Sequence, residues 1–230
     1  MLQAIDGLML AHVSLGAGAI LAGVLAFAAP KGRPVHILAG RGFVVMMSLS
    51  SALGAILGLI KAEQFYITFH AGILALTLIL SAWMAARDRS GQPRGAHLFL
   101  TGIALLNTVV LGFVGVKAQG AVGGTLMGFA AEDYFFLAGL SGLVVIMDAS
   151  LLFRKAVSDR HRIARHLWRM GLGFFIAAGS AFTGPGAKAF PEWVQASGLL
   201  RLPEFITLAL ILFWLFFILF RREKAMKTPI

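Results

Sequence analysis

The chain has 230 residues, of which 59% are hydrophobic and only 13% are charged. This composition excludes an ordinary soluble domain and indicates an integral membrane protein. The chain contains no cysteine, which excludes disulfides, iron–sulfur clusters and covalently attached c-type haem. The formal net charge is +10, but the basic residues lie between apolar runs rather than on a separate domain, so we expect no nucleic-acid partner.

Seven apolar runs follow one another along the chain. A helix needs about 20 apolar residues to cross the ~30 Å hydrocarbon core of a bilayer, and continuous rather than alternating runs favour helices over a barrel. The sequence therefore predicts an all-α integral membrane bundle of seven helices, over residues 6–29, 36–60, 65–86, 97–117, 131–153, 163–183 and 203–221. We interpret the first run as a mature helix rather than a signal peptide, because it is longer than a signal h-region and no Lys or Arg precedes it.

The basic residues indicate the orientation of these helices. When the predicted spans alternate, sixteen of the 20 Lys and Arg residues fall on one side and four on the other. The positive-inside rule makes the richer side cytoplasmic, so the N-terminus is expected outside and the C-terminus in the cytoplasm. We expect a location in the bacterial inner membrane, with the lipid bilayer as the surroundings and anionic headgroups near the basic loops.

The predicted domain organisation is a single transmembrane domain. Residues 1–117 are expected to form a four-helix core that carries histidines, and residues 118–230 to add three helices with two long outer segments, 118–130 and 184–202. Within the second segment, Pro191 to Gln195 is expected to form a short interfacial helix anchored by Trp193. For both segments, the interpretation that we favour is an ordinary connector.

Four histidines recur at two depths of the predicted bundle. His12 and His70 lie just inside the outer face on the first and third helices, whereas His36 and His97 begin the second and fourth helices at the cytoplasmic face. Alternate helices face each other across an antiparallel four-helix bundle. Each pair can therefore hold the iron of one b-type haem between two imidazoles, giving one or two haems. Histidines placed in the headgroup zone, without a cofactor, are the alternative.

A basic stripe opens the sixth predicted helix, because Arg162, Arg165, His166 and Arg169 recur at spacings of three and four residues. His166 is the second choice as the inner haem ligand if His97 does not serve. Four arginines lie at the depth where propionates of an inner haem are expected: Arg33, Arg41, Arg94 and Arg165. The interpretation that we favour for the stripe itself is an interfacial anchor of snorkelling arginines.

Two polar residues lie inside predicted helices. Asp148, in the fifth, is costly to bury unpaired, so we expect it to contact Arg154, Arg169 or a histidine of a neighbouring helix. Asn107, in the fourth, is expected to form a hydrogen bond between helices.

Two segments resemble a family of bacterial multi-span membrane proteins of unknown function: Lys31 to Gly40, which reads KGRPVHILAG, and Arg165 to Met170, which reads RHLWRM. That resemblance covers most of the chain and implies no activity. The histidines on four successive helices are similar in arrangement to transmembrane di-haem b-type cytochromes, which pass electrons from a cytoplasmic donor to an acceptor across the membrane. By position, this second resemblance implies that His12 and His70 bind an outer haem and that His36 and His97 bind an inner one.

The leading hypothesis is a b-type cytochrome-like membrane protein that transfers electrons across the membrane, with a quinone or a small reductant as partner. The competing hypothesis is a membrane protein without a cofactor, such as a small transporter or an assembly module, whose histidines are structural or handle protons.

Overall fold

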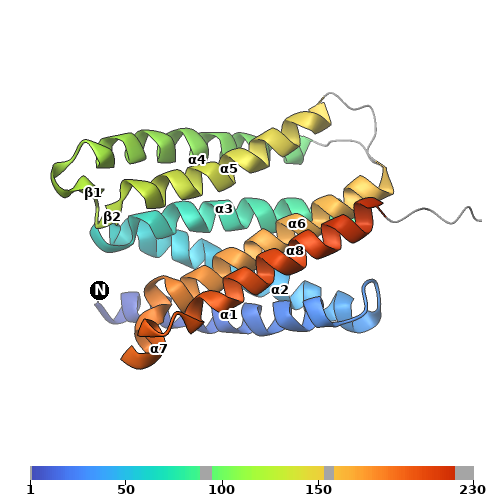
Figure 1. The fold of residues 1–230 in the computed structure, drawn as a ribbon, viewed down its shortest axis with the longest axis horizontal. Helices are drawn as coiled ribbons and strands as arrows, with labels where there is room; N and C mark the ends of the chain where they lie inside the picture. Colours follow the sequence, from blue (N-terminus) through green and yellow to red (C-terminus); the bar gives the residue numbers. More distant parts are fainter. Residues whose placement is uncertain (1, 89–94, 153–157, 221–230) are drawn as a thin grey trace, which may run out of the picture.

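Each long apolar run of the sequence forms one α-helix. The structure, a computed structural model, describes residues 2–88, 95–152 and 158–220. Its long helices lie side by side along one axis (Figure 1), and they are α1 (Leu2–Ala28), α2 (Pro34–Ile60), α3 (Ala62–Arg87), α4 (Gly95–Gln119), α5 (Ala131–Leu152), α6 (Asp159–Ala178) and α8 (Leu202–Phe220). The predicted all-α class is confirmed.

The α1–α2 connection shows how glycine and proline end one helix and begin the next. Gly32 adopts a φ of +76°, a conformation that side chains with a Cβ disfavour, and so turns the chain after α1. Pro34 then opens α2, at a position where the missing N–H is not needed.

Five helical segments of the described chain are long and apolar enough to cross a membrane: Ile5–Ala28, Pro34–Ile60, Ala62–Arg87, Gly95–Gln119 and Leu199–Phe220. Their number supports a multi-span membrane protein. Helices α5 and α6 also form at predicted positions, but their crossing of the membrane and the orientation of the bundle stay predictions. Arg94, Arg154 and the basic residues after Phe220 lie outside the described residues.

Helix α3 lies in the middle of the bundle. Figure 1 shows the α4–α5 pair on one side of it and the α1–α2 pair on the other, with α6 and α8 crossing in front. Helices α2 and α3 approach so closely that a Cβ added to Gly58 would lie 2.4 Å from the backbone nitrogen of Phe69. The helices that pack most extensively are neighbours in sequence, together with α3 and α6.

Two apolar clusters fill the interior on either side of α3. Helices α3, α4 and α5 contribute Leu78, Leu111 and Val144 to the first cluster, all fully buried. The second cluster joins α1, α2, α3 and α6 through Ala19, Phe43, Ile79 and Phe174. Because α3 and α6 contribute to both clusters, they position the side chains described below.

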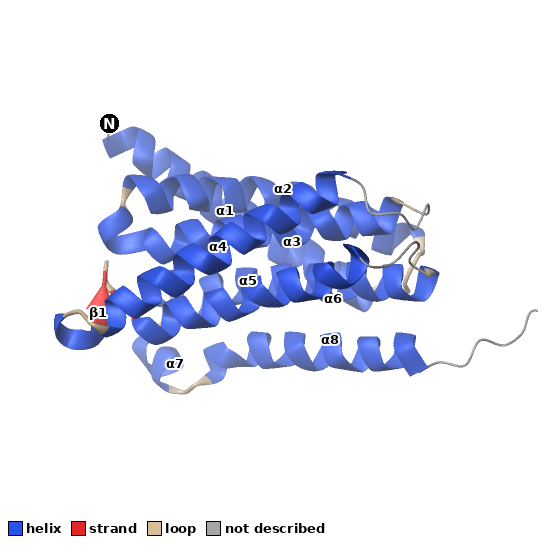
Figure 2. Ribbon diagram, turned by 90° about the horizontal axis from the view of Figure 1, so that it is seen from above, coloured by secondary structure: helices blue, strands red, loops and turns tan. Residues whose placement is uncertain are grey.

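The end of the bundle that carries the N-terminus holds short elements. A tight antiparallel hairpin of β1 (Thr125–Leu126) and β2 (Phe129–Ala130) follows α4 (Figure 2). Farther along, the short helix α7 (Glu192–Ala196) confirms the one predicted from the sequence, and the Trp193 side chain is 69% exposed. Single turns of 3-10 or π helix complete the connections: Val122–Gly124, Gly179–Thr183, Pro185–Ala189 and Leu199–Arg201.

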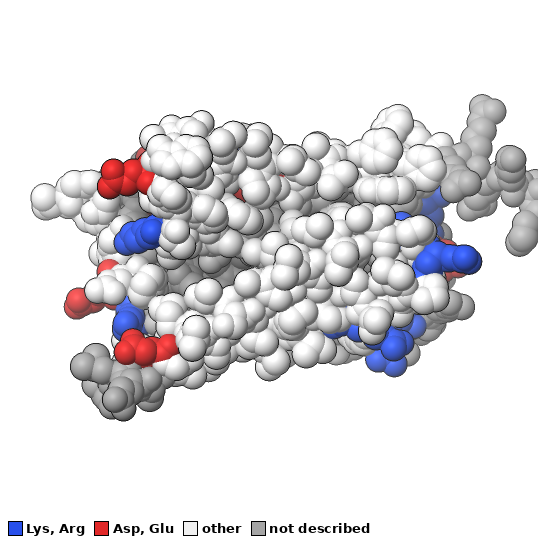
Figure 3. Space-filling view, turned by 90° about the horizontal axis from the view of Figure 1, so that it is seen from below, with Lys and Arg blue, Asp and Glu red and all other residues white. Residues whose placement is uncertain are grey.

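Charged side chains gather at the two ends of the bundle. On the face drawn in Figure 3, a broad uncharged band separates an end rich in Lys and Arg from an end that holds most of the Asp and Glu. An uncharged belt flanked by charged ends is the pattern expected of a protein embedded in a bilayer. The basic end holds the α1–α2 connection, which is predicted to face the cytoplasm.

Candidate functional site

A cavity of about 850 Å³ lies at the basic end, between α1, α2, α3, α6 and α8. Its volume falls within the range typical of small-molecule and cofactor sites, roughly 300–1,000 Å³. Its walls are mainly apolar and include five aromatic side chains: Phe27, Phe43, Trp83, Phe174 and Trp214. Such a lining suits a large, flat, apolar ligand.

Two histidines from different helices line this cavity, His36 near the start of α2 and His166 in α6. The Nδ1 atom of His36 lies 2.9 Å from the carbonyl oxygen of Ala26, and that of His166 lies 3.1 Å from the carbonyl oxygen of Ala82. A carbonyl oxygen can only accept, so each Nδ1–H donates and each Nε2 of the neutral imidazole keeps a lone pair. The two imidazoles are close enough to interact electrostatically.

Two of the cationic side chains at the cavity donate hydrogen bonds to carbonyl groups at the C-terminal ends of helices. The Nζ atom of Lys31 donates to the carbonyl oxygen of Phe27 at 2.6 Å and so satisfies the end of α1. The guanidinium of Arg162 donates to the carbonyl oxygens of Ala85 and Ala86, at 3.2 and 3.1 Å, at the end of α3. These two side chains therefore have a structural role at the cavity wall.

Arg41 and Arg87 also line the cavity, and their guanidinium groups make no hydrogen bond to another residue of the described chain. Arg41 is exposed. The guanidinium of Arg87 lies 5.2 Å from the ring centre of Trp83, in a cation–π contact that holds it at the wall. Both groups are available to bind an anionic substituent of a ligand.

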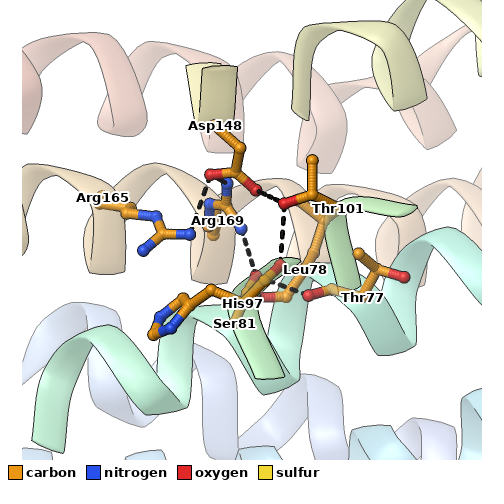
Figure 4. A network of polar contacts seen from close by, with 8 residues as sticks. All are labelled: Thr77, Leu78, Ser81, His97, Thr101, Asp148, Arg165 and Arg169. Carbon is orange, nitrogen blue, oxygen red and sulfur yellow. Dashed lines mark hydrogen bonds and ion pairs between the residues drawn. The ribbon is translucent and has the colours of Figure 1, made fainter. Parts of the chain in front are cut away.

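A buried polar cluster lies where side chains of α3, α4, α5 and α6 meet (Figure 4). We call it the Asp148 cluster, and it consists of Ser81, His97, Thr101, Asp148, Arg165 and Arg169. Asp148 accepts from Arg165 at 2.8 Å and from Thr101 at 2.8 Å, and it also pairs with Arg169. Arg169 is fully buried and donates to the hydroxyl of Ser81. The expected pairing of Asp148 with Arg169 is confirmed.

His97 lies in this cluster and does not line the cavity. Its side chain is 5% exposed, and neither ring nitrogen has a hydrogen-bond partner in the part of the chain that the structure describes. The structure therefore places His166, the second choice, in the same cavity as His36, whereas His97 lies in the Asp148 cluster. Arg165 likewise belongs to the cluster rather than to the cavity, while Arg41 lies at the cavity.

The two outer histidines contact different helices. The Nδ1 atom of His12 lies 2.8 Å from the carbonyl oxygen of Ser50 on α2. That of His70 lies 2.7 Å from the amide oxygen of Asn107 on α4, which confirms the interhelical bond expected of Asn107. No hydrogen bond or ring contact between described residues joins His12 to His70. Their role as an outer haem pair stays a prediction.

No protein-family model, curated protein or solved structure matches the chain. The composition and the helix lengths identify the general class of the protein. It is a multi-span helical membrane protein. Within the described residues, no group of three or more His, Asp or Glu side chains is placed to hold a metal ion. A haem iron differs from such an ion, because its porphyrin supplies four nitrogens and the protein needs to add only one or two.

Proposed function

We propose that the protein is a b-type cytochrome-like membrane protein, with one haem in the cavity between the Nε2 atoms of His36 and His166. The observation that carries this proposal is that two imidazoles, both anchored through Nδ1 to backbone carbonyls, line one apolar cavity. Hydrogen bonds of this kind orient metal-binding histidines and make the free nitrogen a better donor.

The remaining walls also suit haem. The aromatic side chains provide flat apolar surface for the macrocycle, and the unbound guanidinium groups of Arg41 and Arg87 can pair with its two propionates. Arginine suits this role because its planar fork binds a carboxylate through two parallel hydrogen bonds. The haem would supply one-electron redox chemistry, and the protein residues would bind it, orient it and exclude water from it.

The position of the cavity suggests how electrons would reach it. The cavity lies at the basic end, which the positive-inside rule makes cytoplasmic. Because α1, α2 and α8 expose large apolar side chains to the surroundings of the bundle, a quinone dissolved in the bilayer is a suitable partner, as is a small cytoplasmic reductant. In this proposal, transfer across the membrane requires a second acceptor nearer the outer face.

Reduced-minus-oxidised absorption spectra test the proposal. Protein purified from haem-replete cells should show the bands of a six-coordinate, low-spin b haem. His36→Ala and His166→Ala should each abolish that spectrum. His161→Ala is the matched control, because His161 lies on the same helix as His166 but is exposed, and among the described residues its side chain forms a hydrogen bond only with Ser158.

Two results would contradict the proposal. One is a colourless wild-type protein that also fails to bind added haemin. The other is an unchanged six-coordinate spectrum in both variants, provided that each variant elutes as a folded, monodisperse species. Either result would favour the alternative of a membrane protein without a cofactor.

A further inference from the structure

The Asp148 cluster contains an excess of hydrogen-bond donors. Four of its buried nitrogen atoms have no hydrogen-bond partner within the described residues: Nδ1 and Nε2 of His97, Nε of Arg165 and Nε of Arg169. A guanidinium Nε can only donate, and a neutral imidazole donates from one of its two nitrogens. Buried donors of this kind are rarely left unsatisfied in native proteins.

The carboxylate oxygens of Asp148 and the hydroxyl oxygen of Ser81 already have donors. Oδ1 of Asp148 accepts from Arg165 and Arg169, and Oδ2 accepts from Thr101. The hydroxyl of Ser81 accepts from Arg169 and donates to the carbonyl oxygen of Thr77 at 2.6 Å. None of these acceptors satisfies the four nitrogen atoms named above.

The cluster also carries more positive than negative charge. Two guanidinium groups share one carboxylate, and uncompensated buried charge is strongly destabilising. His97 lies within electrostatic reach of both arginines and of Asp148, as the close view in Figure 4 illustrates. Asp88, at the end of α3, is the other acid within electrostatic reach of His97, but it is not among the charges that act on Arg165.

We propose that the Asp148 cluster binds one small monovalent anion, chloride in the cell, between His97, Arg165 and Arg169. Chloride carries the missing negative charge and accepts several N–H groups at once. The Arg165 side chain is 13% exposed, so one edge of the cluster reaches the surface and gives an ion a route of entry. None of His97, Arg165 and Arg169 lines the cavity, so this proposal does not depend on haem.

Anion-dependent stability tests this proposal on the full chain in detergent. Chloride is titrated against gluconate at constant ionic strength, and the midpoint of thermal unfolding is measured. We expect a saturable rise of about 2–4 °C for the wild type. Arg165→Gln should remove the rise. Arg162→Gln is the matched control, because it removes a charge from the same helix on the cavity side, and it should keep the rise.

A second measurement decides the case in which Arg165→Gln does not fold. The guanidinium of Arg169 lies 4.9 Å from the ring centre of Trp168, which makes this tryptophan a reporter of the cluster. Bromide should quench a saturable part of the wild-type fluorescence, and Trp168→Phe should remove that part. The proposal is wrong if the unfolding midpoint is the same in chloride and gluconate, if Arg162→Gln loses the rise as fully as Arg165→Gln, or if no quenching saturates.

Discussion

Asp148 on α5 and Arg169 on α6 form an ion pair inside the bundle, in which the Arg169 side chain is fully buried. Helix α5 has few other contacts with α6, so this pair and the neighbouring Arg165–Asp148 pair are the main link between these two helices, whereas the α4–α5 hairpin packs on α3 through the first apolar cluster. Removing one partner of a buried ion pair is costly, because the other charge is then left buried without compensation.

Asp148→Asn should therefore destabilise the protein by about 3–5 kcal/mol, because it leaves two buried guanidinium groups without a carboxylate. Unfolding in mixed detergents, followed by circular dichroism, measures the change. Asp159→Asn is the control, since Asp159 is an exposed acid that pairs with Arg162 at the surface, and it should unfold almost as the wild type does. Equal stability of the two variants would show that the buried pair contributes little.

Gly58→Ala should also destabilise the bundle. Its new methyl group would lie 2.4 Å from the backbone nitrogen of Phe69 and 2.8 Å from the carbonyl oxygen of Phe65, and backbone cannot move aside as a side chain can. We expect a loss of about 1–3 kcal/mol. Gly40→Ala lies in the same helix with nothing within 4 Å of its methyl group, so the same unfolding assay should show no loss there, and a slight gain from helix propensity.

Haem stoichiometry tests whether the outer histidines bind a second cofactor. If only the cavity binds haem, pyridine haemochrome assays should give one haem per chain. His12→Ala and His70→Ala should then keep the low-spin spectrum, because neither residue lines the cavity. Two haems per chain, with one lost in both variants, would instead support the predicted outer pair.

The arginines at the cavity should contribute to haem affinity. Arg41→Gln and Arg87→Gln should each weaken haemin binding roughly tenfold, the loss expected for one charge-assisted hydrogen bond to a propionate. Titration of the apoprotein with haemin measures the affinity. Arg33→Gln is the control, because Arg33 lies beside α2 at the same end but does not line the cavity. A loss of equal size in the control would indicate a general effect of charge.

The absence of native cysteine makes the orientation easy to test. In intact cells, a maleimide that cannot cross the inner membrane should label Ser197→Cys, next to α7, and should not label Arg33→Cys. After lysis it should label both variants. The opposite result would invert the predicted topology and place the cavity at the outer face.

The sequence predicted helices at positions where the structure has them, because a long apolar run in lipid must satisfy its backbone hydrogen bonds internally. It also predicted the partners of Asp148 and Asn107, because polar groups buried in a membrane need partners. These predictions depend on local composition and on the cost of leaving a polar group unpaired.

The grouping of the histidines could not be predicted in the same way. The expectation that alternate helices face each other led to the pairing of His36 with His97. In the structure, α6 packs against α3 and brings His166 to the cavity instead. The position of Trp214 could not be predicted for a similar reason. The composition of the last helix indicates a lipid-facing element, but the Trp214 ring lines the cavity. Which helix inserts between which others depends on side-chain packing over long sequence separations, and a hydrophobic pattern does not encode it.

The polar faces of α6 have a consequence for how the chain enters the bilayer. A segment that carries Arg162, Arg165 and Arg169 would be unstable among lipid chains by itself. Once Asp148 is beside it, two of those charges share a counter-ion and much of their solvation cost is offset. We therefore expect the translocation machinery to release α5 and α6 into the bilayer together, as one hairpin, after α3 has been inserted.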